Sequence, residues 1–346
     1  MAEESVFLGF LEEAEHWQLH SRQFPSKVGG KPAWLSQLEI PTISELTCEK
    51  CKLPTVFLLQ VYAPIPGHDI SFHRTIFVFC CKTPDCYLPN DSRCLKAFRS
   101  QLPRRNNFYP FDPPSDEPSE TDLDPCLLSS GIKLCKLCGC PGQKTCSRCH
   151  AVSYCSKEHQ TIDWKLCHKT ECCKQGPSKA VPSTYLFPES ELVTEPEDQQ
   201  KDSTETVEEE QNDPECSTLA DGLAETELED MAMHETQDSK VFQKFKQRIS
   251  PEPHQVLRYC RGGSPLWVSS KHVPTEKDIP NCACGSKRIF EFQVMPQLLN
   301  NLKVDSPDAS IDWGTLAVYT CADSCNRGEE YPTEFIWKQD VTGEQM

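Results

Sequence analysis

Paired cysteine and histidine residues between Cys135 and Cys172 constrain this chain more than any other feature of its sequence. They form four short-spaced pairs: Cys135/Cys138, Cys146/Cys149, Cys155/His159 and His168/Cys172. Structural zinc takes four tetrahedral Cys or His ligands, usually from two such pairs that the fold brings together. Four pairs therefore predict two zinc ions, and a scatter of reduced core cysteines would not explain their regularity. A segment this short cannot bury a self-sufficient core, so we expect zinc binding to supply its folding energy.

The order of these pairs resembles the MYND zinc finger, in which the first and third pairs bind one ion and the second and fourth pairs bind the other. The resemblance implies that one zinc is held by Cys135, Cys138, Cys155 and His159. It implies that the second is held by Cys146, Cys149, His168 and Cys172. His159 stands where many members have cysteine, and imidazole is an equally good zinc ligand. The spare thiols of the segment are Cys140, Cys167 and Cys173.

The cysteine content and the charge restrict the compartment and the partners. The 346 residues include 22 Cys, and the formal net charge is −17. Dense cysteine behind an acidic N-terminal stretch favours zinc thiolates in a reducing compartment, so we expect cytoplasm or nucleus. No apolar run approaches the roughly 20 residues that span a bilayer, so we expect no membrane association. An acidic chain is poorly suited to phosphate binding and suggests a basic protein partner.

A second set of cysteines flanks two predicted strands in the first third of the chain. Its four proposed zinc ligands are Cys48, Cys51, Cys81 and Cys86. Apolar, β-branched runs at 55–62 and 72–79 lie between the two pairs and predict a strand hairpin. A hairpin between two ligand pairs is the layout of a zinc ribbon. Cys80 is an alternative ligand to Cys81, and Cys94 is a weaker candidate that we expect to be a buried thiol.

The same layout recurs near the C-terminus. Its proposed ligands are Cys282, Cys284, Cys321 and Cys325. Residues 290–294 echo 57–61, and residues 315–319 echo 75–79. This repeat predicts an internal duplication, and the two apolar hairpins are most simply buried against each other. The predicted fold is therefore β-rich α+β, with one domain that is discontinuous in sequence. Two unrelated hairpins that resemble each other by chance are the alternative.

The segments between the halves differ in composition. The predicted organisation is a first half of the β-rich domain at 1–110, a proline-rich acidic linker at 111–130, the finger at 131–173, an acidic segment at 174–239 and a second half at 240–346. Residues 189–238 hold 19 Asp/Glu and one Lys, which predicts disorder. The alternative for this run is contact with a basic partner. Helices are expected at 240–249 and 255–259, and a closing strand at 334–340.

Aromatic residues surround a Gly- and Pro-rich loop at 24–35. Its composition predicts a shaped loop rather than a helix. Trp17, Phe24 and Trp34 are interpreted as core anchors. The alternative is that the loop presents aromatic side chains to a client protein.

Motifs along nearly the whole chain resemble the programmed cell death protein 2 family. In the first half they are QFPSKVGG at 23–30, QVYAP at 60–64, FHR at 72–74 and QLPR at 101–104. In the second half they are VLRY at 256–259, EFQVMPQLL at 291–299, SIDWG at 310–314 and WKQD at 337–340. The resemblance implies a dedicated chaperone that holds one nascent small-subunit ribosomal protein, number two in the eukaryotic count and number five in the bacterial one. It further implies movement between cytoplasm and nucleus and a role in small-subunit (40S) biogenesis.

Three other functions are alternatives to this one. Family members are also linked to apoptosis, proliferation and corepressor complexes, so a nuclear adaptor that recruits partners through the finger is the alternative. Catalysis is not expected, because the chain lacks a Gly-rich phosphate loop and closed four-ligand zinc sites leave no position open for chemistry. Seven Lys and Arg residues are scattered through the finger, which is typical of a solvated face, so direct nucleic-acid binding is not expected. The expected cofactor is zinc, with two ions in the finger and two in the duplicated hairpins.

Overall fold

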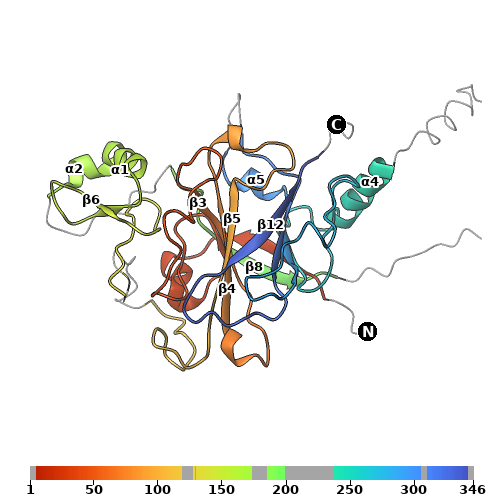
Figure 1. Cartoon of the computed structure of the whole chain (residues 1–346), viewed down its shortest axis with the longest axis horizontal. Coiled ribbons are helices and arrows are strands. Elements are labelled where there is room, and N and C mark those ends of the chain that lie inside the picture. The colour runs from red at the N-terminus through yellow and green to blue at the C-terminus, as the bar shows by residue number, and fades with distance from the viewer. Residues whose placement is uncertain are drawn as a thin grey trace, which may run out of the picture.

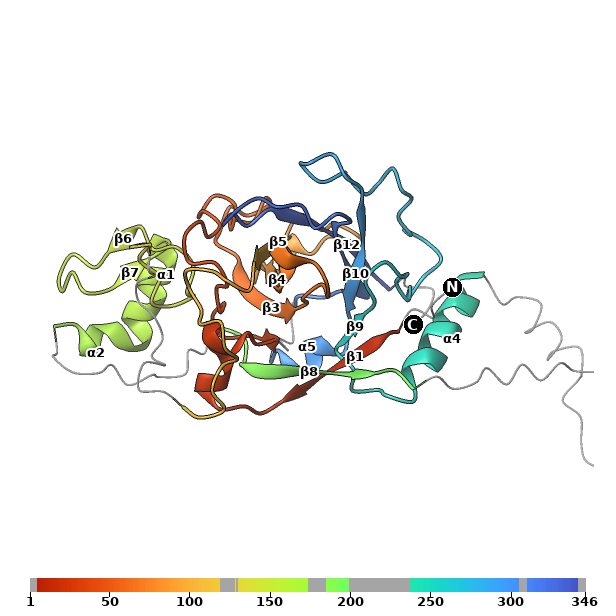
Figure 2. The same ribbon diagram turned by 90° about the horizontal axis from the view of Figure 1, so that it is seen from below.

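The computed structural model describes residues 5–118, 128, 130–173, 185–198, 237–304 and 310–341. Within these ranges, ten antiparallel strands form a closed barrel in the order β1-β8-β2-β3-β4-β5-β12-β11-β10-β9 (Figure 2). The strands of the first half are β1 Phe7–Glu12, β2 Lys27–Val28, β3 Val56–Tyr62, β4 His73–Cys80 and β5 Leu95–Leu102. Strand β8 Ser190–Pro196 comes from the acidic segment between the halves. The strands of the second half are β9 Leu257–Tyr259, β10 Arg288–Val294, β11 Thr315–Cys321 and β12 Thr333–Gln339.

Smaller elements surround the barrel. The finger contains β6 Lys144–Thr145, β7 Ser153–Tyr154, α1 Lys157–Asp163, the π-helical turn η5 Trp164–His168 and α2 Lys169–Glu171. The other helices are η1 His16–Leu19, η2 Ser21–Gln23, η3 Asp69–Ser71, η4 Pro84–Cys86, α4 Gln237–Ile249 and α5 Leu298–Asn301. The finger and α4 lie at opposite ends of the molecule (Figure 1). Among the helices in the described ranges, none combines the length and apolar character needed to cross a bilayer.

The two predicted hairpins have the same construction. Strand β3 pairs with β4 and β4 with β5, and β10–β11–β12 repeat this order. The β3–β4 register shifts between Phe57 and Leu59, and the β10–β11 register shifts between Phe290 and Phe292. Bulges at equivalent positions agree with the predicted duplication, because a bulge is a local feature that unrelated hairpins have no reason to share.

The discontinuous β-rich domain is confirmed, and apolar side chains of both hairpins share one buried cluster, but the halves are also joined through their strand edges, which was not predicted. Each hairpin gains a third strand, and β5 pairs with β12 at Phe98–Thr333 and Ala97–Glu334. The halves therefore join edge to edge around a barrel, which leaves few unpaired strand edges. Figure 2 shows β5 and β12 on one side of the barrel and β1 and β8 on the other.

The remaining strands pair with segments that are distant in the sequence. Strand β1 of the first half pairs with β8 and β9, whereas β8 pairs with β1 and β2. Strand β8 lies inside the stretch 189–238, so the predicted disorder is wrong for Ser190–Pro196. Leu192 is its one fully buried side chain, and backbone pairing rather than apolar content accounts for the strand. Residues 199–236 of that stretch lie outside the described residues.

The interior of the barrel combines an apolar cluster with two buried ion pairs. Arg74 on β4 donates two hydrogen bonds to Glu291 on β10, at 2.7 and 2.9 Å. Arg99 on β5 donates to Glu334 on β12 at 2.8 Å, and all four side chains are fully buried. Burial alone would raise the pKa of Glu291, but the charge and hydrogen bonds of Arg74 lower it. Each pair therefore links one half of the barrel to the other.

The aromatic loop at 24–35 is packed against the outside of β3 and β4. Trp34 is buried, stacks on Phe77 and Phe79, and meets Tyr331 edge to face. Gln60 holds the loop by accepting from Ala33 N and donating to Pro25 O, both at 2.9 Å. The core-anchor interpretation is therefore confirmed for Trp34, which is not available to a client.

Of the three other elements predicted from the sequence, two are confirmed and one is wrong. The helix expected at 240–249 is α4, and the closing strand expected at 334–340 is β12. The helix expected at 255–259 is wrong, because Leu257–Tyr259 forms β9 between β1 and β10. Long-range pairing overrides the local helical pattern at this position.

Candidate metal centres

Four groups of cysteine and histidine side chains converge in the structure, and they contain all sixteen predicted ligands. They are Cys135/Cys138/Cys155/His159, Cys146/Cys149/His168/Cys172, Cys48/Cys51/Cys81/Cys86 and Cys282/Cys284/Cys321/Cys325. In each group the candidate ligand atoms all lie within 4.8 Å of one another. Zinc–sulfur bonds of about 2.3 Å in a tetrahedron place sulfur atoms about 3.8 Å apart. The groups therefore have the dimensions and chemistry of structural zinc sites.

The first finger group is assembled around the start of α1. Ser156 caps this helix by accepting a hydrogen bond from His159 N at 3.1 Å, which fixes His159 next to Cys155. The Sγ atoms of Cys138 and Cys155 are 3.7 Å apart, and Cys135 Sγ lies 3.9 Å from His159 Nδ1. The other imidazole nitrogen, Nε2, contacts the hydroxyl of Tyr185 at 3.2 Å. A partner on that nitrogen is the usual way in which proteins orient a zinc-bound histidine.

The second finger group uses the turn η5. His168 Nε2 lies 3.5 Å from Cys149 Sγ. Asp163, just before the turn, accepts a hydrogen bond from Tyr154 at 2.6 Å and one from Cys167 at 3.1 Å. Cys167 is thus a hydrogen-bond donor outside both groups, and the other spare thiols, Cys140 and Cys173, also lie outside them. The pairing implied by the resemblance agrees with this geometry.

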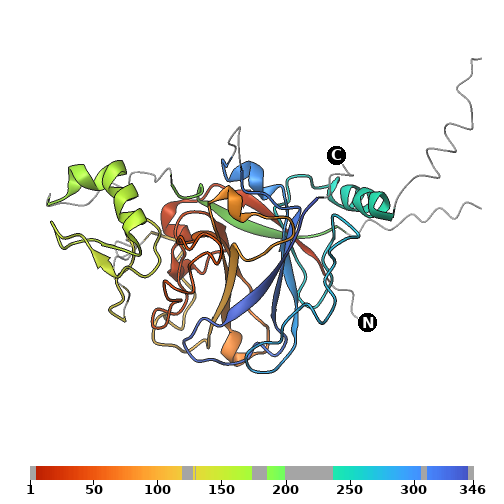
Figure 3. The ribbon, with the colours of Figure 1, turned by 45° about the horizontal axis from the view of Figure 1, so that its top comes forward.

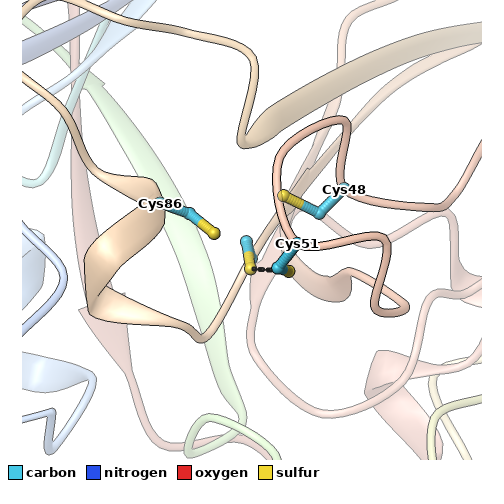
Figure 4. Close-up of side chains that lie close together, drawn as sticks. Cys48, Cys51 and Cys86 are labelled. Carbon is cyan, nitrogen blue, oxygen red and sulfur yellow. Dashed lines mark hydrogen bonds between the residues drawn. The ribbon is translucent and has the colours of Figure 1, made fainter.

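The third group lies at one end of β3 and β4 (Figure 4). Cys51 and Cys81 Sγ are 3.5 Å apart, and Thr83 N donates to Cys81 Sγ at 3.3 Å. Cys80 is excluded from this group, because successive side chains on a strand point to opposite faces. Burial raises the pKa of Cys80 to about 12, and Cys94 is likewise a buried thiol outside the group.

The fourth group repeats the third in the second half. Cys282 and Cys325 Sγ are 3.6 Å apart, as are those of Cys284 and Cys321. The register of the two hairpins makes Cys321 the counterpart of Cys81 and Thr320 the counterpart of Cys80. Arg99 donates to Cys325 Sγ at 3.5 Å. A guanidinium at this position stabilises the negative charge of a four-thiolate site.

The finger is docked on the barrel through residues on both sides of it. Trp34 Nε1 donates to Gly139 O at 2.8 Å. Tyr185, between the finger and β8, contacts His159 and also accepts a short hydrogen bond from Lys82 to its carbonyl oxygen. Lys82 follows Cys81 directly, so Tyr185 connects a finger site to a barrel site. Neither Tyr185 nor Arg99 carried a spacing signal that could have identified it from the sequence.

Comparison with known proteins follows the same division of the chain. Residues 5–116 match the family model "Programmed cell death protein 2, N-terminal domain", and residues 239–341 match "Programmed cell death protein 2, C-terminal putative domain". Residues 135–172 match the MYND finger. The chain belongs to the programmed cell death protein 2 family. The family models leave out β8, although this strand is part of the barrel.

Similarity to individual members of the programmed cell death protein 2 family covers nearly the full length. The chain is 52% identical to Programmed cell death protein 2 of Rattus norvegicus, over 98% of this chain and 97% of the relative. It is 28% identical to the human Programmed cell death protein 2-like, over 87% of this chain and 85% of the relative. It is 26% identical to the Probable 20S rRNA accumulation protein 4 of Schizosaccharomyces pombe, over 93% of each chain. No solved structure matches the chain.

The contact between Tyr185 and His159 leads to a prediction about the first finger site. We expect Tyr185→Phe to release zinc from this site to a competing chelator about tenfold faster, because the histidine loses the hydrogen bond that orients it. Release can be followed with a colorimetric zinc indicator. Tyr62→Phe is a matched control, since Tyr62 also contacts a histidine, His73, at 3.0 Å but away from any ligand group. Equal release from both variants would show that Tyr185 does not support the site.

Proposed function

We propose that this chain is a dedicated chaperone for a basic protein of the small ribosomal subunit and supports 40S biogenesis. The observation that carries the proposal is the similarity over 93% of the chain to a relative whose name refers to 20S rRNA accumulation. The net charge of −17 supports it, because an acidic chain neutralises a basic client and keeps it from binding RNA elsewhere. The proposed client is small-subunit ribosomal protein number two (number five in bacteria). The proposed role is binding without catalysis, in the cytoplasm and nucleus.

Zinc has a structural part in this proposal. Each group offers four protein ligands, so a bound ion has no open position for substrate. Zinc would supply charge neutralisation and cross-linking, while the barrel residues present the binding surface. Two ions are proposed for the finger and two for the ends of the barrel hairpins.

The chaperone proposal is tested by purification and by a solubility assay. Tagged full-length protein is expected to enrich the proposed client over ribosomal proteins of similar basic charge. Co-expression is expected to move the client from the pellet to the supernatant after centrifugation. A client that is neither enriched nor solubilised would overturn the proposal.

A second candidate is a nuclear adaptor that recruits corepressor partners through the finger. It is supported by the finger's position at one end of the molecule (Figure 1), where Leu166 on η5 is 45% exposed. Leu166→Glu should abolish recruitment of such partners without changing client capture, because Leu166 is not a zinc ligand. Unchanged recruitment by this variant would overturn the adaptor role of that surface.

A further inference from the structure

One strand of the barrel is much shorter than the gap it fills. Strand β2 has two residues and lies between β8 and β3. Ser26 extends the pairing by one bond, since its carbonyl accepts from Leu192 N at 2.9 Å. The chain then turns away at Phe24, which has a left-handed φ of 50°. Beyond Ser26, the space between β8 and β3 therefore has no strand of the described chain in it, and we call this space the β8–β3 seam.

The seam exposes a strand edge. Leu192 N faces β2 and Glu197 N faces β1, where it donates to Val6 O at 2.8 Å. Backbone groups alternate in direction along an antiparallel strand, so the N–H and C=O of Thr194 face the seam. Among the described residues neither group is paired with a strand on that side, and Thr194 is exposed. An unpaired edge of this kind is a template for an additional strand.

A groove lies along this edge. It has a volume of about 410 Å³, within the range of ligand sites. On the β8 side it is lined by Leu192 and Thr194, and across from them by Tyr62 at the end of β3. Gln23 closes one side by donating to Ser115 O at 2.9 Å. Figure 3 shows the start of green β8 beside the red N-terminal segment that carries η1 and η2.

The lining of the groove indicates the charge of its occupant. Its charged residues are Asp116 and Glu191, and none of the lining residues is Lys, Arg or His. Trp17, Phe24 and Tyr62 add aromatic rings. Carboxylates together with aromatic faces suit arginine and lysine, through ion pairs and cation–π contacts. Free main-chain groups on the same edge suit an extended peptide rather than a helix.

We infer that the β8–β3 seam binds an extended, Lys/Arg-rich segment of the client, which pairs with Thr194 and adds a strand to the barrel. The inference rests on the proposed function, because the client supplies the segment. Main-chain pairing gives affinity that is independent of sequence, and the carboxylates select for positive charge. The occupied seam would fill the gap that β2 leaves.

The first test removes the donor on the strand edge. Thr194→Pro lacks the N–H that faces the seam, yet the pairing of β8 with β1 uses the alternate residues. Thr194→Val is the matched control, because it changes the side chain and keeps the N–H. We expect client affinity to fall at least tenfold for the proline variant and to stay within twofold for valine. In hydrogen exchange, client binding is expected to protect the amide of Thr194.

The second test reverses the charge of the groove without touching the backbone. Asp116→Lys with Glu191→Lys should weaken client binding at least tenfold. Glu252→Lys with Glu276→Lys makes the same change in net charge at exposed positions outside the groove and should have little effect. A photo-reactive benzoylphenylalanine in place of Gln18 should cross-link to a basic segment of the client.

The outcomes separate this inference from the proposed function. A wild-type chain that does not bind the client would overturn the chaperone role. Wild-type binding that persists in Thr194→Pro and in the charge-reversed variant would overturn the seam alone. Cross-links that form within this chain, or with no protein, would also overturn it.

Discussion

Replacing Cys81 by serine is expected to lower the zinc content from four ions per chain to three and to destabilise the barrel strongly. Cys81 follows β4 directly and converges with Cys48, Cys51 and Cys86. Serine is a poor ligand for zinc, and a structural site contributes its binding free energy to folding, about 10–16 kcal/mol in isolated finger peptides. Part of that energy is enough to unfold a domain whose net stability is about 5–15 kcal/mol.

The neighbouring Cys80 provides the control for this experiment. Cys80→Ala should keep four zinc ions per chain and cost about 1–2 kcal/mol, because it removes one buried sulfur atom and leaves a small cavity. Zinc per chain is measured by elemental analysis after purification without added metal, and stability by thermal unfolding. Three zinc ions in Cys80→Ala, or four zinc ions retained in Cys81→Ser, would show that Cys80 rather than Cys81 is the ligand. Two zinc ions in the wild type would reduce the barrel groups to buried thiols.

Breaking the buried pair of Arg74 and Glu291 should also have a large effect, with an unequal cost for its two members. Removing one partner of a buried ion pair costs about 3–5 kcal/mol, because the other charge remains buried. After Arg74→Met, Glu291 still has Arg261 at 3.2 Å and donors from Tyr259 and Thr320. After Glu291→Leu, Arg74 keeps no carboxylate bound to it among the residues that the structure describes. We therefore expect Glu291→Leu to be the more destabilising variant.

The double variant Arg74→Met/Glu291→Leu is the control for this prediction. It replaces both charges by apolar side chains of similar size and should recover most of the stability lost in Glu291→Leu. Urea unfolding of the wild type, the two single variants and the double variant completes the cycle. Additive losses in the double variant would contradict a direct coupling between the halves of the barrel.

The metal ligands could be predicted because their signal is local. A pair such as Cys48/Cys51 can be recognised within four residues of sequence. The similarity of residues 57–61 to residues 290–294 indicated that the two barrel groups are equivalent. Cys80 and Cys81 could not be distinguished in this way. The alternation of apolar and polar residues normally shows which face of a strand is buried. Every residue of β4 is buried, so its pattern does not show which of Cys80 and Cys81 faces the ligand group.

The closure of the barrel could not be predicted, because it depends on contacts between distant residues. Strand β8 has four polar or charged residues among seven, which gives it the composition of the acidic segment around it. Strand β2 is too short to recognise, and β9 resembles a helix until its partners β1 and β10 are known. Trp34 was interpreted as a core anchor, but its hydrogen bond to Gly139 of the finger has no counterpart in the pattern of the sequence.

The pairing of β1 with β9 and of β5 with β12 has a consequence for the order of events during translation. Strand β1 leaves the ribosome early, but β9, one of its two neighbours, follows about 250 residues later. Likewise β5 cannot pair with β12 until residues up to Gln339 have been synthesised. Neither half can complete its own sheet, so the nascent chain has open strand edges until β12 is made. Because such edges promote aggregation, this protein would itself need protection while it is being synthesised. A product truncated before β12 would contain no half with a complete sheet.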